Sequence, residues 1–230
     1  MRAIVFATDL RKIVAGSSPR PGIRCGGPCD ADQLIAAGAD AKWLDWGISN
    51  GSTFIVAEEE GRIAGYSCYA TCENVPHFSW LVIRLRPGLD VCSVGGFVIP
   101  ERRGHRIRGD MRCFAARYFF EQGYQRMIGV VDATNTASLR SNATSGTDRF
   151  ATLTRVRIGK LIVVWQGRAL RHVRWGARPF AFVVPESASS QSFASNNADP
   201  GNCLGRVDRV LPLGCSDHRA RRRQDGYTSC

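Results

Sequence analysis

The sequence predicts one α/β (α+β) domain with a mixed, mostly antiparallel sheet flanked by helices. The chain has 230 residues, 44% of them hydrophobic, which suffices for one substantial core but not for two full enzymatic domains. Before Pro100 the apolar residues form short strand-like runs, and after it they recur every four residues, as in a helix. Alternating strand and helix signals then continue to about residue 184, which favours a sheet covered by helices.

The first third of the sequence indicates a strand, a loop, a helical segment and a hairpin, in that order. Residues 3–7 form a strand-like run, and residues 16–28 are so rich in glycine, proline and serine that we expect a loop. Residues 30–46 carry apolar side chains at three- and four-residue spacing, typical of one amphipathic helix or two short ones. The runs at 53–57 and 63–71 then predict an antiparallel hairpin.

The rest of the chain alternates strands with helices. Strands are expected at 81–85 and 91–99. A helix is expected from Ile107 to Gly123, a residue that suits a helix C-cap. Further strands are expected at 127–131, 156–165 and 178–184, with a short helix through Leu139 after the first of them.

Composition divides the chain into three parts. Residues 1–29 hold the N-terminal strand and the Gly/Pro-rich loop, and residues 30–185 form the predicted domain. Residues 186–230 are rich in serine and asparagine and end in a basic cluster with little apolar support, which favours a disordered tail.

The formal net charge of +11 would suit a nucleic-acid partner. Nearly all of it is arginine, so solvated arginines are the interpretation we favour, and nucleic acid is an alternative partner through the basic tail. No apolar run approaches the ~20 residues that cross a bilayer, and the N-terminus lacks the apolar core of a secretory signal. We therefore expect a cytoplasmic protein with no membrane partner and reduced cysteines.

Two further patterns have alternative explanations. The Cys-x-x-x-Cys pairs at 25–29 and 68–72 lack the Cys-x-x-Cys knuckle of zinc sites, so we expect no metal. His172 and Trp175 stand among arginines and could stack on a nucleic-acid base, although an exposed edge strand explains them equally well.

The segment from Val98 to Ile107 predicts an anion site. It reads as the end of a strand, a basic loop and the start of a helix. A helix N-terminus presents free backbone N–H groups and a favourable dipole, and arginines can grip phosphate oxygens in a fork.

From this segment onward the sequence resembles the GNAT superfamily of acyl-CoA N-acyltransferases. Members show a Val-x-Pro-x-x-Arg-Gly segment, a helix ending in glycine, an apolar strand and an Asn-x-x-Ser helix ending near a glycine. The matching residues are Val98, Pro100, Arg103, Gly104, Gly123, Asn135, Ser138, Leu139 and Gly146. The resemblance covers about residues 33–164.

The resemblance implies a GNAT-like sheet whose fourth and fifth strands splay apart to receive the pantetheine arm of acetyl-CoA, the expected co-substrate. The strand at 97–99 would pair with the pantetheine amides, and the loop at 103–108 would cradle the pyrophosphate. Asn135 would lie along the other wall of the cleft, although it could equally be only a helix cap. The implied cofactor-binding residues are Phe97, Val98, Ile99, Arg103, Gly104, His105, Arg106, Ile107, Arg108, Gly109, Asn135 and Ser138.

The phosphate loop departs from the family pattern, because Arg106 and Arg108 stand where the family has glycine. Glycine permits a positive φ and lets a phosphate approach the backbone closely. The two arginines could therefore crowd the pocket, or their guanidinium groups could bind phosphate directly. We favour retained CoA binding.

The family's catalytic positions also differ here. The tyrosine that many members use as an acid is replaced by Asn142, and a base glutamate found in some is replaced by Cys92. The catalytic candidates are thus Cys92, as a nucleophile or only a buried structural thiol, together with Asp90 and Asn142. Further candidates for a base acting through water are Glu58, Glu59 and His77.

The sequence thus predicts an N-acetyltransferase that moves an acetyl group from acetyl-CoA to an amine of a small molecule or peptide, by direct attack in a ternary complex. A backbone N–H near Val98 would polarise the thioester, and the first helices with the loops at 74–80 would form the acceptor pocket. The alternative is a catalytically impaired GNAT-shaped module that binds CoA or nucleic acid. A homodimer fits either function.

Overall fold

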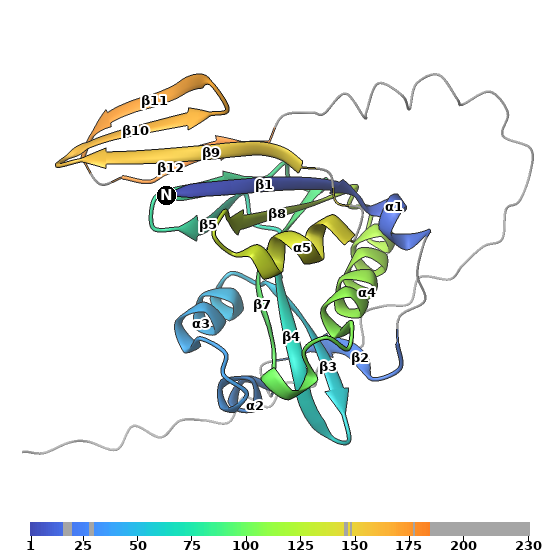
Figure 1. Ribbon diagram of the computed structural model, residues 1–230. Helices are drawn as coiled ribbons and strands as arrows, with labels where there is room; N and C mark the ends of the chain where they lie inside the picture. The colour runs from blue at the N-terminus through green and yellow to red at the C-terminus, as the bar shows by residue number, and fades with distance from the viewer. Residues whose placement is uncertain (16–19, 28–29, 145–146, 148, 177, 185–230) are drawn as a thin grey trace, which may run out of the picture. The chain divides into compact units, whose positions relative to one another are not determined.

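The computed structural model describes residues 1–15, 20–27, 30–144, 147, 149–176 and 178–184, and residues 1–185 form one compact unit (Figure 1). The tail expected at 186–230 lies outside the described residues. The helices are α1 (Leu10–Val14), α2 (Ala31–Ala36), α3 (Ala41–Ser49), α4 (Ile107–Glu121) and α5 (Thr136–Thr144). The strands are β1 (Arg2–Asp9), β2 (Ile23–Gly26), β3 (Thr53–Glu59), β4 (Arg62–Ala70), β5 (Asn74–Phe78), β6 (Leu81–Arg84), β7 (Asp90–Val98), β8 (Arg126–Asp132), β9 (Arg149–Ile158), β10 (Leu161–Gln166), β11 (Ala169–Trp175) and β12 (Phe180–Val183).

The main sheet has nine strands in the order β11-β10-β9-β1-β8-β7-β4-β3-β2. Its neighbours are antiparallel except for the parallel pair β7 and β8, so the predicted class is confirmed. The predicted 53–71 hairpin, the helix from Ile107 and the strand at 127–131 appear as β3–β4, α4 and β8. The helical signal at 30–46 resolves into two helices, α2 and α3.

The N-terminal residues are part of this same sheet. β1 lies between β8 and β9, so the boundary drawn after residue 29 does not separate structural units. β2 pairs with β3 at the edge, so the expectation that 16–28 is entirely loop was wrong. β3 supplies the backbone hydrogen-bond partners of β2, and local sequence patterns do not reveal such a distant partner.

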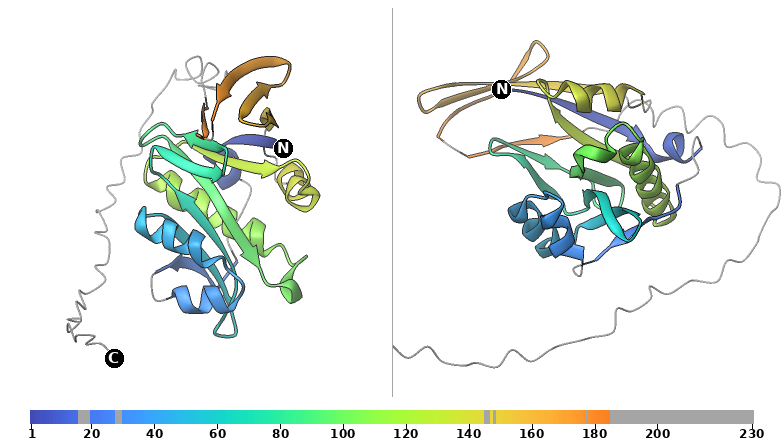
Figure 2. Two further views of the ribbon diagram at one scale, coloured as in Figure 1. Left: turned by 90° about the vertical axis from the view of Figure 1, so that its left-hand side faces the viewer. Right: turned by 60° about the horizontal axis from the view of Figure 1, so that its bottom comes forward.

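Helices cover both faces of the sheet, because its residues alternate between two cores. On β3, Ile55 packs with α4, whereas Phe54 and Val56 pack with α2 and α3. On β1, Phe6 packs near Leu139 of α5, whereas its neighbour Val5 faces a second, three-stranded sheet on the opposite side. Figure 2 shows these layers from two further directions.

The second sheet, in the order β12-β6-β5, packs on the main sheet through Leu81, Ile83 and Phe182. Residues 74–78, expected as a loop, form its strand β5. The run at 156–165, expected as one strand, is divided between β9 and β10 by a turn at Gly159, whose φ is 59°.

β7 and β8 separate after a short paired segment. Only Asp90–Ser93 of β7 pair with β8, and their partners there are Arg126–Gly129. β7 then shifts register at a bulge near Val94 and continues along β4, while β8 continues along β1 (Figure 1). This divergence is the splaying expected of the family's fourth and fifth strands, and it opens the sheet in its centre.

Candidate functional site

A cleft of about 1360 Å³ lies beside the end of β7, beyond the segment in which β7 pairs with β8. Its walls come from the end of β7, the loop before α4, the first turns of α4, and α5. The predicted cofactor-binding residues that line it are Phe97, Val98, Arg103, Gly104, Arg106, Ile107, Arg108, Gly109, Asn135 and Ser138. The structure thus gathers all of the predicted set except Ile99 and His105.

One wall of the cleft is the open edge of β7. The Ile99 N–H donates to the Ala64 carbonyl of β4 at 3.0 Å, which removes Ile99 from the cleft. Because backbone groups alternate in direction along an antiparallel strand, the N–H groups of Val98 and Gly96 point away from β4. The Val98 carbonyl points the same way and accepts from Arg103 Nε at 3.2 Å. This edge can receive an extended ligand by strand-like pairing.

The loop before α4 has a left-handed turn at Arg106. Its φ is 63° at the N-cap of α4, and its side chain makes no capping hydrogen bond. Gly104 has a φ of 87°, and a Cβ there would have nothing within 4 Å. Arg108 lies inside the helix, so of the two arginines that replace family glycines only Arg106 occupies a conformation that favours glycine, at a cost of ~1 kcal/mol.

Cations dominate the lining of the cleft from its mouth to its inner end. The cations that line it are Lys12, Arg20, Arg102, Arg103, Arg106, Arg108 and Arg112, whereas Asp110 is the one carboxylate among its described lining residues. A cleft lined by one sign of charge focuses the field and attracts an oppositely charged ligand. The site therefore suits a polyanion.

Arg20 anchors the loop before α4. Its guanidinium donates to the His105 carbonyl at 3.1 Å and pairs with Asp110 at 3.4 Å and with Glu59 at 3.5 Å. Glu59 also pairs with Arg102 at 3.1 Å. His105 thus anchors the loop through its backbone carbonyl, and His105 itself does not line the cleft.

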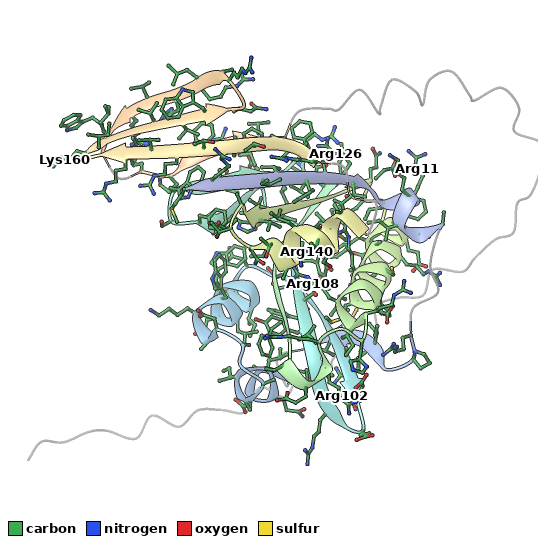
Figure 3. The ribbon with its side chains drawn as sticks, viewed as in Figure 1. Arg11, Arg102, Arg108, Arg126, Arg140 and Lys160 are labelled. Carbon is green, nitrogen blue, oxygen red and sulfur yellow. The ribbon has the colours of Figure 1, made fainter. Side chains whose placement is uncertain are left out.

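Asn135 and Ser138 hold the opposite wall. Asn135 Oδ1 accepts from the Ser138 N–H at 3.0 Å, so the predicted cap of α5 is present, and both residues also line the cleft. Ser138 Oγ accepts from Arg108 Nη1 at 3.3 Å, which links α5 to α4 across the cleft. Figure 3 shows Arg108 beneath α5, and Arg102 farther from α5, by the loop before α4.

A second, smaller cavity of about 80 Å³ lies at the fork of β7 and β8, and we call it the inner chamber. It shares Arg108, Gly109, Arg112 and Ser141 with the cleft, so it forms the inner end of that cleft. Its other walls include residues 93–95 of β7, residues 127–131 of β8, Tyr69 and Asn142.

Asn142 is committed to other protein groups. Its Oδ1 accepts from Arg112 Nη1 at 3.0 Å, and its Nδ2 donates to the Ser138 carbonyl at 2.9 Å. An amide does not ionise, so Asn142 cannot supply the acid for which its position was considered. Burial raises the pKa of the nearby Tyr69 phenol to about 12, although Arg112 and Arg108 oppose that shift.

Asp90 is a structural ion-pair partner and is not placed to act as a base. It is fully buried, and Arg126 binds both carboxylate oxygens at 2.8 and 3.0 Å while Arg86 binds at 3.2 Å. Burial disfavours its charge, but the hydrogen bonds from Arg126 and Arg86 outweigh burial and hold its pKa below the usual range.

Cys92 is likewise removed from the cleft. It is fully buried in the core beneath the second sheet, and burial raises its thiol pKa. A thiol in apolar surroundings is a poor nucleophile, so the structural alternative holds for Cys92.

The other base candidates do not line the cleft either. Glu59 serves the Arg20 network, and Glu58 pairs with Arg24 at 3.1 Å. His77 lies on β5, where burial lowers its pKa to about 4 although its own backbone and that of Ser93 oppose the shift. Neither ring nitrogen of His77 has a well-formed hydrogen bond within the described part of the chain.

The remaining sequence patterns fall outside the cleft. Trp175 and His172 lie on the edge strand β11, as the edge-strand alternative expected. Cys29 lies outside the described residues, and among those described no group of three His, Cys, Asp or Glu side chains is arranged to hold a metal. In the same residues, no helix is both long and apolar enough to cross a membrane.

Sequence reasoning missed Lys12, Arg20 and Arg112 as lining residues. Arg112 follows Arg108 by four positions, which places both on one helix face, so its spacing was an available signal. Nothing in the sequence near Lys12 or Arg20 indicated that these residues meet the loop before α4.

No protein-family model and no curated protein matches the chain. Among solved structures, a putative GNAT-family acetyltransferase from Novosphingobium aromaticivorans is 16% identical, with a TM-score of 0.49 and coverage of 66% of this chain and 62% of that one. A functionally unknown protein from Staphylococcus epidermidis is 12% identical, with a TM-score of 0.49 and coverage of 66% and 58%. An aminoglycoside N-acetyltransferase in complex with CoA is 16% identical, with a TM-score of 0.46 and coverage of 59% and 96%.

The chain spans less than two thirds of the length of the first two of these structures. At such identities the likeness concerns the fold alone. The central sheet of this chain opens between β7 and β8, as the resemblance noted in the sequence implies.

Proposed function

We propose that the protein is an acyl-CoA N-acyltransferase that moves an acetyl group from acetyl-CoA to the amine of a small molecule or peptide by direct attack in a ternary complex. The observation that carries this proposal is the cleft beside the end of β7, whose mouth is cationic and whose inner end is the small chamber at the fork of β7 and β8. An elongated molecule with phosphates at one end and a reactive group at the other matches that polarity.

The residues present fit CoA at each part of its length. The N-terminus of α4 and the arginines at 103, 106 and 108 line the cleft and suit the phosphates. The open edge of β7 suits the pantetheine amides, which need partners for their N–H and carbonyl groups. The free space beside Gly104 supports phosphate binding despite the two arginines that replace glycine.

The chain's own contribution to transfer would be positioning and electrostatics. A backbone N–H on the open edge of β7 would polarise the thioester carbonyl, in the manner of an oxyanion hole. The amine nitrogen attacks the carbonyl carbon, the C–S bond breaks, and the amine loses one proton. The described residues that line the inner chamber include no carboxylate or histidine, so that proton would pass to water.

Calorimetry with CoA on the full chain tests this proposal. We expect micromolar binding, weakened at least tenfold by Arg103→Ala together with Arg108→Ala. Arg62→Ala, at the exposed start of β4, is the matched control and should bind as the unchanged protein does. Absence of CoA binding by the unchanged chain contradicts the proposal, and binding justifies a screen of amines by release of free CoA thiol.

A second function has one observation in its favour. Residues 149–176, which we call the arm, span β9 to β11 (Figure 2). They carry no aspartate or glutamate. Their cations are Arg149, Arg155, Arg157, Lys160, Arg168, Arg171 and Arg174. Trp175, 71% exposed on the edge strand, adds a surface on which a base could stack.

A labelled single-stranded oligonucleotide tests the arm. If the arm binds nucleic acid, affinity should fall about a thousandfold between 50 and 200 mM salt and about tenfold with Trp175→Ala. Trp43→Ala, at a partly exposed tryptophan of α3, is the control. No binding at 50 mM salt contradicts this second function.

A further inference from the structure

Transfer from a thioester needs a way to accommodate the departing thiolate, and the inner chamber contains no group placed as the family's acid. The position of that acid is Asn142, an amide that cannot donate a proton in this role. Asn142 instead binds the guanidinium of Arg112. Its Oδ1 accepts from Arg112 Nη1 at 3.0 Å.

The Arg112 guanidinium is fixed at the inner end of the cleft from three elements. It belongs to α4, its Nη1 is bound by α5 through Asn142, and its Nη2 donates to Thr8 Oγ1 of β1 at 3.1 Å. Arg112 lines both the cleft and the inner chamber. Its Nε is buried and has no hydrogen-bond partner in the described part of the chain, so the guanidinium is not fully neutralised or satisfied by protein acceptors there.

The electrostatic surroundings of the chamber favour a negative charge. Among the described residues, its titratable lining groups are Arg108 and Arg112 from α4 and Tyr69 from β4, and none of those residues is a carboxylate. Asp110, in the outer cleft, is already paired with Arg20. Burial lowers the pKa of Arg112, but a guanidinium stays charged in proteins.

We propose that Arg112 stabilises the departing CoA thiolate, so that a fixed cation does the work that an acid at position 142 would do by protonation. The inference rests on the proposed function. When the C–S bond breaks, its electron pair goes to sulfur, and the guanidinium balances that charge until water protonates the thiolate. Asn142 is then a positioning residue for Arg112.

The test measures the thiol pKa of bound CoA and needs no acceptor amine. The thiolate absorbance of the full chain saturated with CoA is titrated with pH, and the same titration with desulfo-CoA is subtracted to remove the protein's own cysteines. We expect the thiol pKa to be at least one unit below that of free CoA, a tenfold gain in thiolate. Arg112→Met should return it to the value of free CoA, and Arg112→Lys should keep part of the shift.

The outcomes separate the two proposals. If CoA does not bind, the proposed function fails. If CoA binds but its thiol pKa is unshifted, or shifted equally in Arg112→Met, the inference about Arg112 is overturned while CoA binding stands. If Arg112→Met does not fold, Asn142→Leu, which removes the oxygen that orients Arg112, replaces it, and an unchanged shift in that variant counts against the proposal.

Discussion

Gly96 of β7 and Tyr66 of β4 approach so closely that a Cβ on Gly96 would lie 2.8 Å from the Tyr66 carbonyl oxygen. The same Cβ would stand 3.0 Å from Ser67 Oγ. Close packing of the two backbones therefore fixes the path of β7 beside the cleft, and it leaves the opposite edge of β7 for a ligand.

This contact predicts that replacing two adjacent glycines with alanine changes stability by different amounts. Gly96→Ala should lower the free energy of unfolding by about 1–3 kcal/mol, as overpacking does, and weaken CoA binding because β7 must shift. Gly95→Ala is the matched control, since a Cβ there meets nothing within 4 Å, and it should change stability by under about 1 kcal/mol. Urea unfolding and calorimetry measure both effects, and equal losses would refute this account of β7.

The two arginines that replace family glycines should also respond in opposite directions. Arg106 has a φ of 63°, so Arg106→Gly should stabilise the protein by up to ~1 kcal/mol. Arg108 lies within α4, so Arg108→Gly should destabilise it by ~1 kcal/mol. Urea midpoints decide this, and destabilisation by Arg106→Gly would show that its side chain contributes more than its backbone conformation costs.

The buried pair of Asp90 and Arg126 predicts a loss of stability. Asp90→Asn leaves the Arg126 guanidinium buried, only 7% exposed, opposite a neutral group, so the free energy of unfolding should fall by about 3 kcal/mol. Glu58→Gln, at a half-exposed pair, should cost at most about 1 kcal/mol. CoA binding at a temperature where both variants are folded should be unchanged, which a catalytic or binding role for Asp90 would not allow.

Acid should destabilise the protein through His77. Its folded pKa of about 4 lies below the ordinary histidine value of 6.5, so between these values the unfolded state binds more protons. Stability should therefore fall as pH drops from about 6.5 towards 4. His77→Phe should flatten that part of the stability profile, and an NMR titration that finds the His77 pKa near 6.5 would contradict the prediction.

Asp90 contributes at lower pH with the same sign. Its folded pKa is depressed, so its contribution is full above the unfolded value near 3.9 and is lost as pH falls through the folded value. In the Asp90→Asn variant this loss should be absent while the His77 step remains. Chemical unfolding at successive pH values separates the two steps.

Local sequence determined the fold class and most of the cleft. The four-residue repeat from Ile107 and the hairpin at 53–71 are set by short-range periodicity, so they were predictable. The segment from Val98 to Gly109 is contiguous and lies at the start of a helix, so its residues reach one wall of the cleft together. Asn135 caps α5 by a bond that spans three residues.

Only the tertiary structure decided which distant residues join that site and which leave it. β1 enters the middle of the sheet because β8 and β9 supply its partners, and Arg20 reaches the loop before α4 from a separate segment. Asp90 and Cys92 stand in a strand beside the site, yet their burial was set by packing against Arg126 and the second sheet. Pairing and burial depend on residues far apart in the chain, whereas local periodicity and helix capping do not.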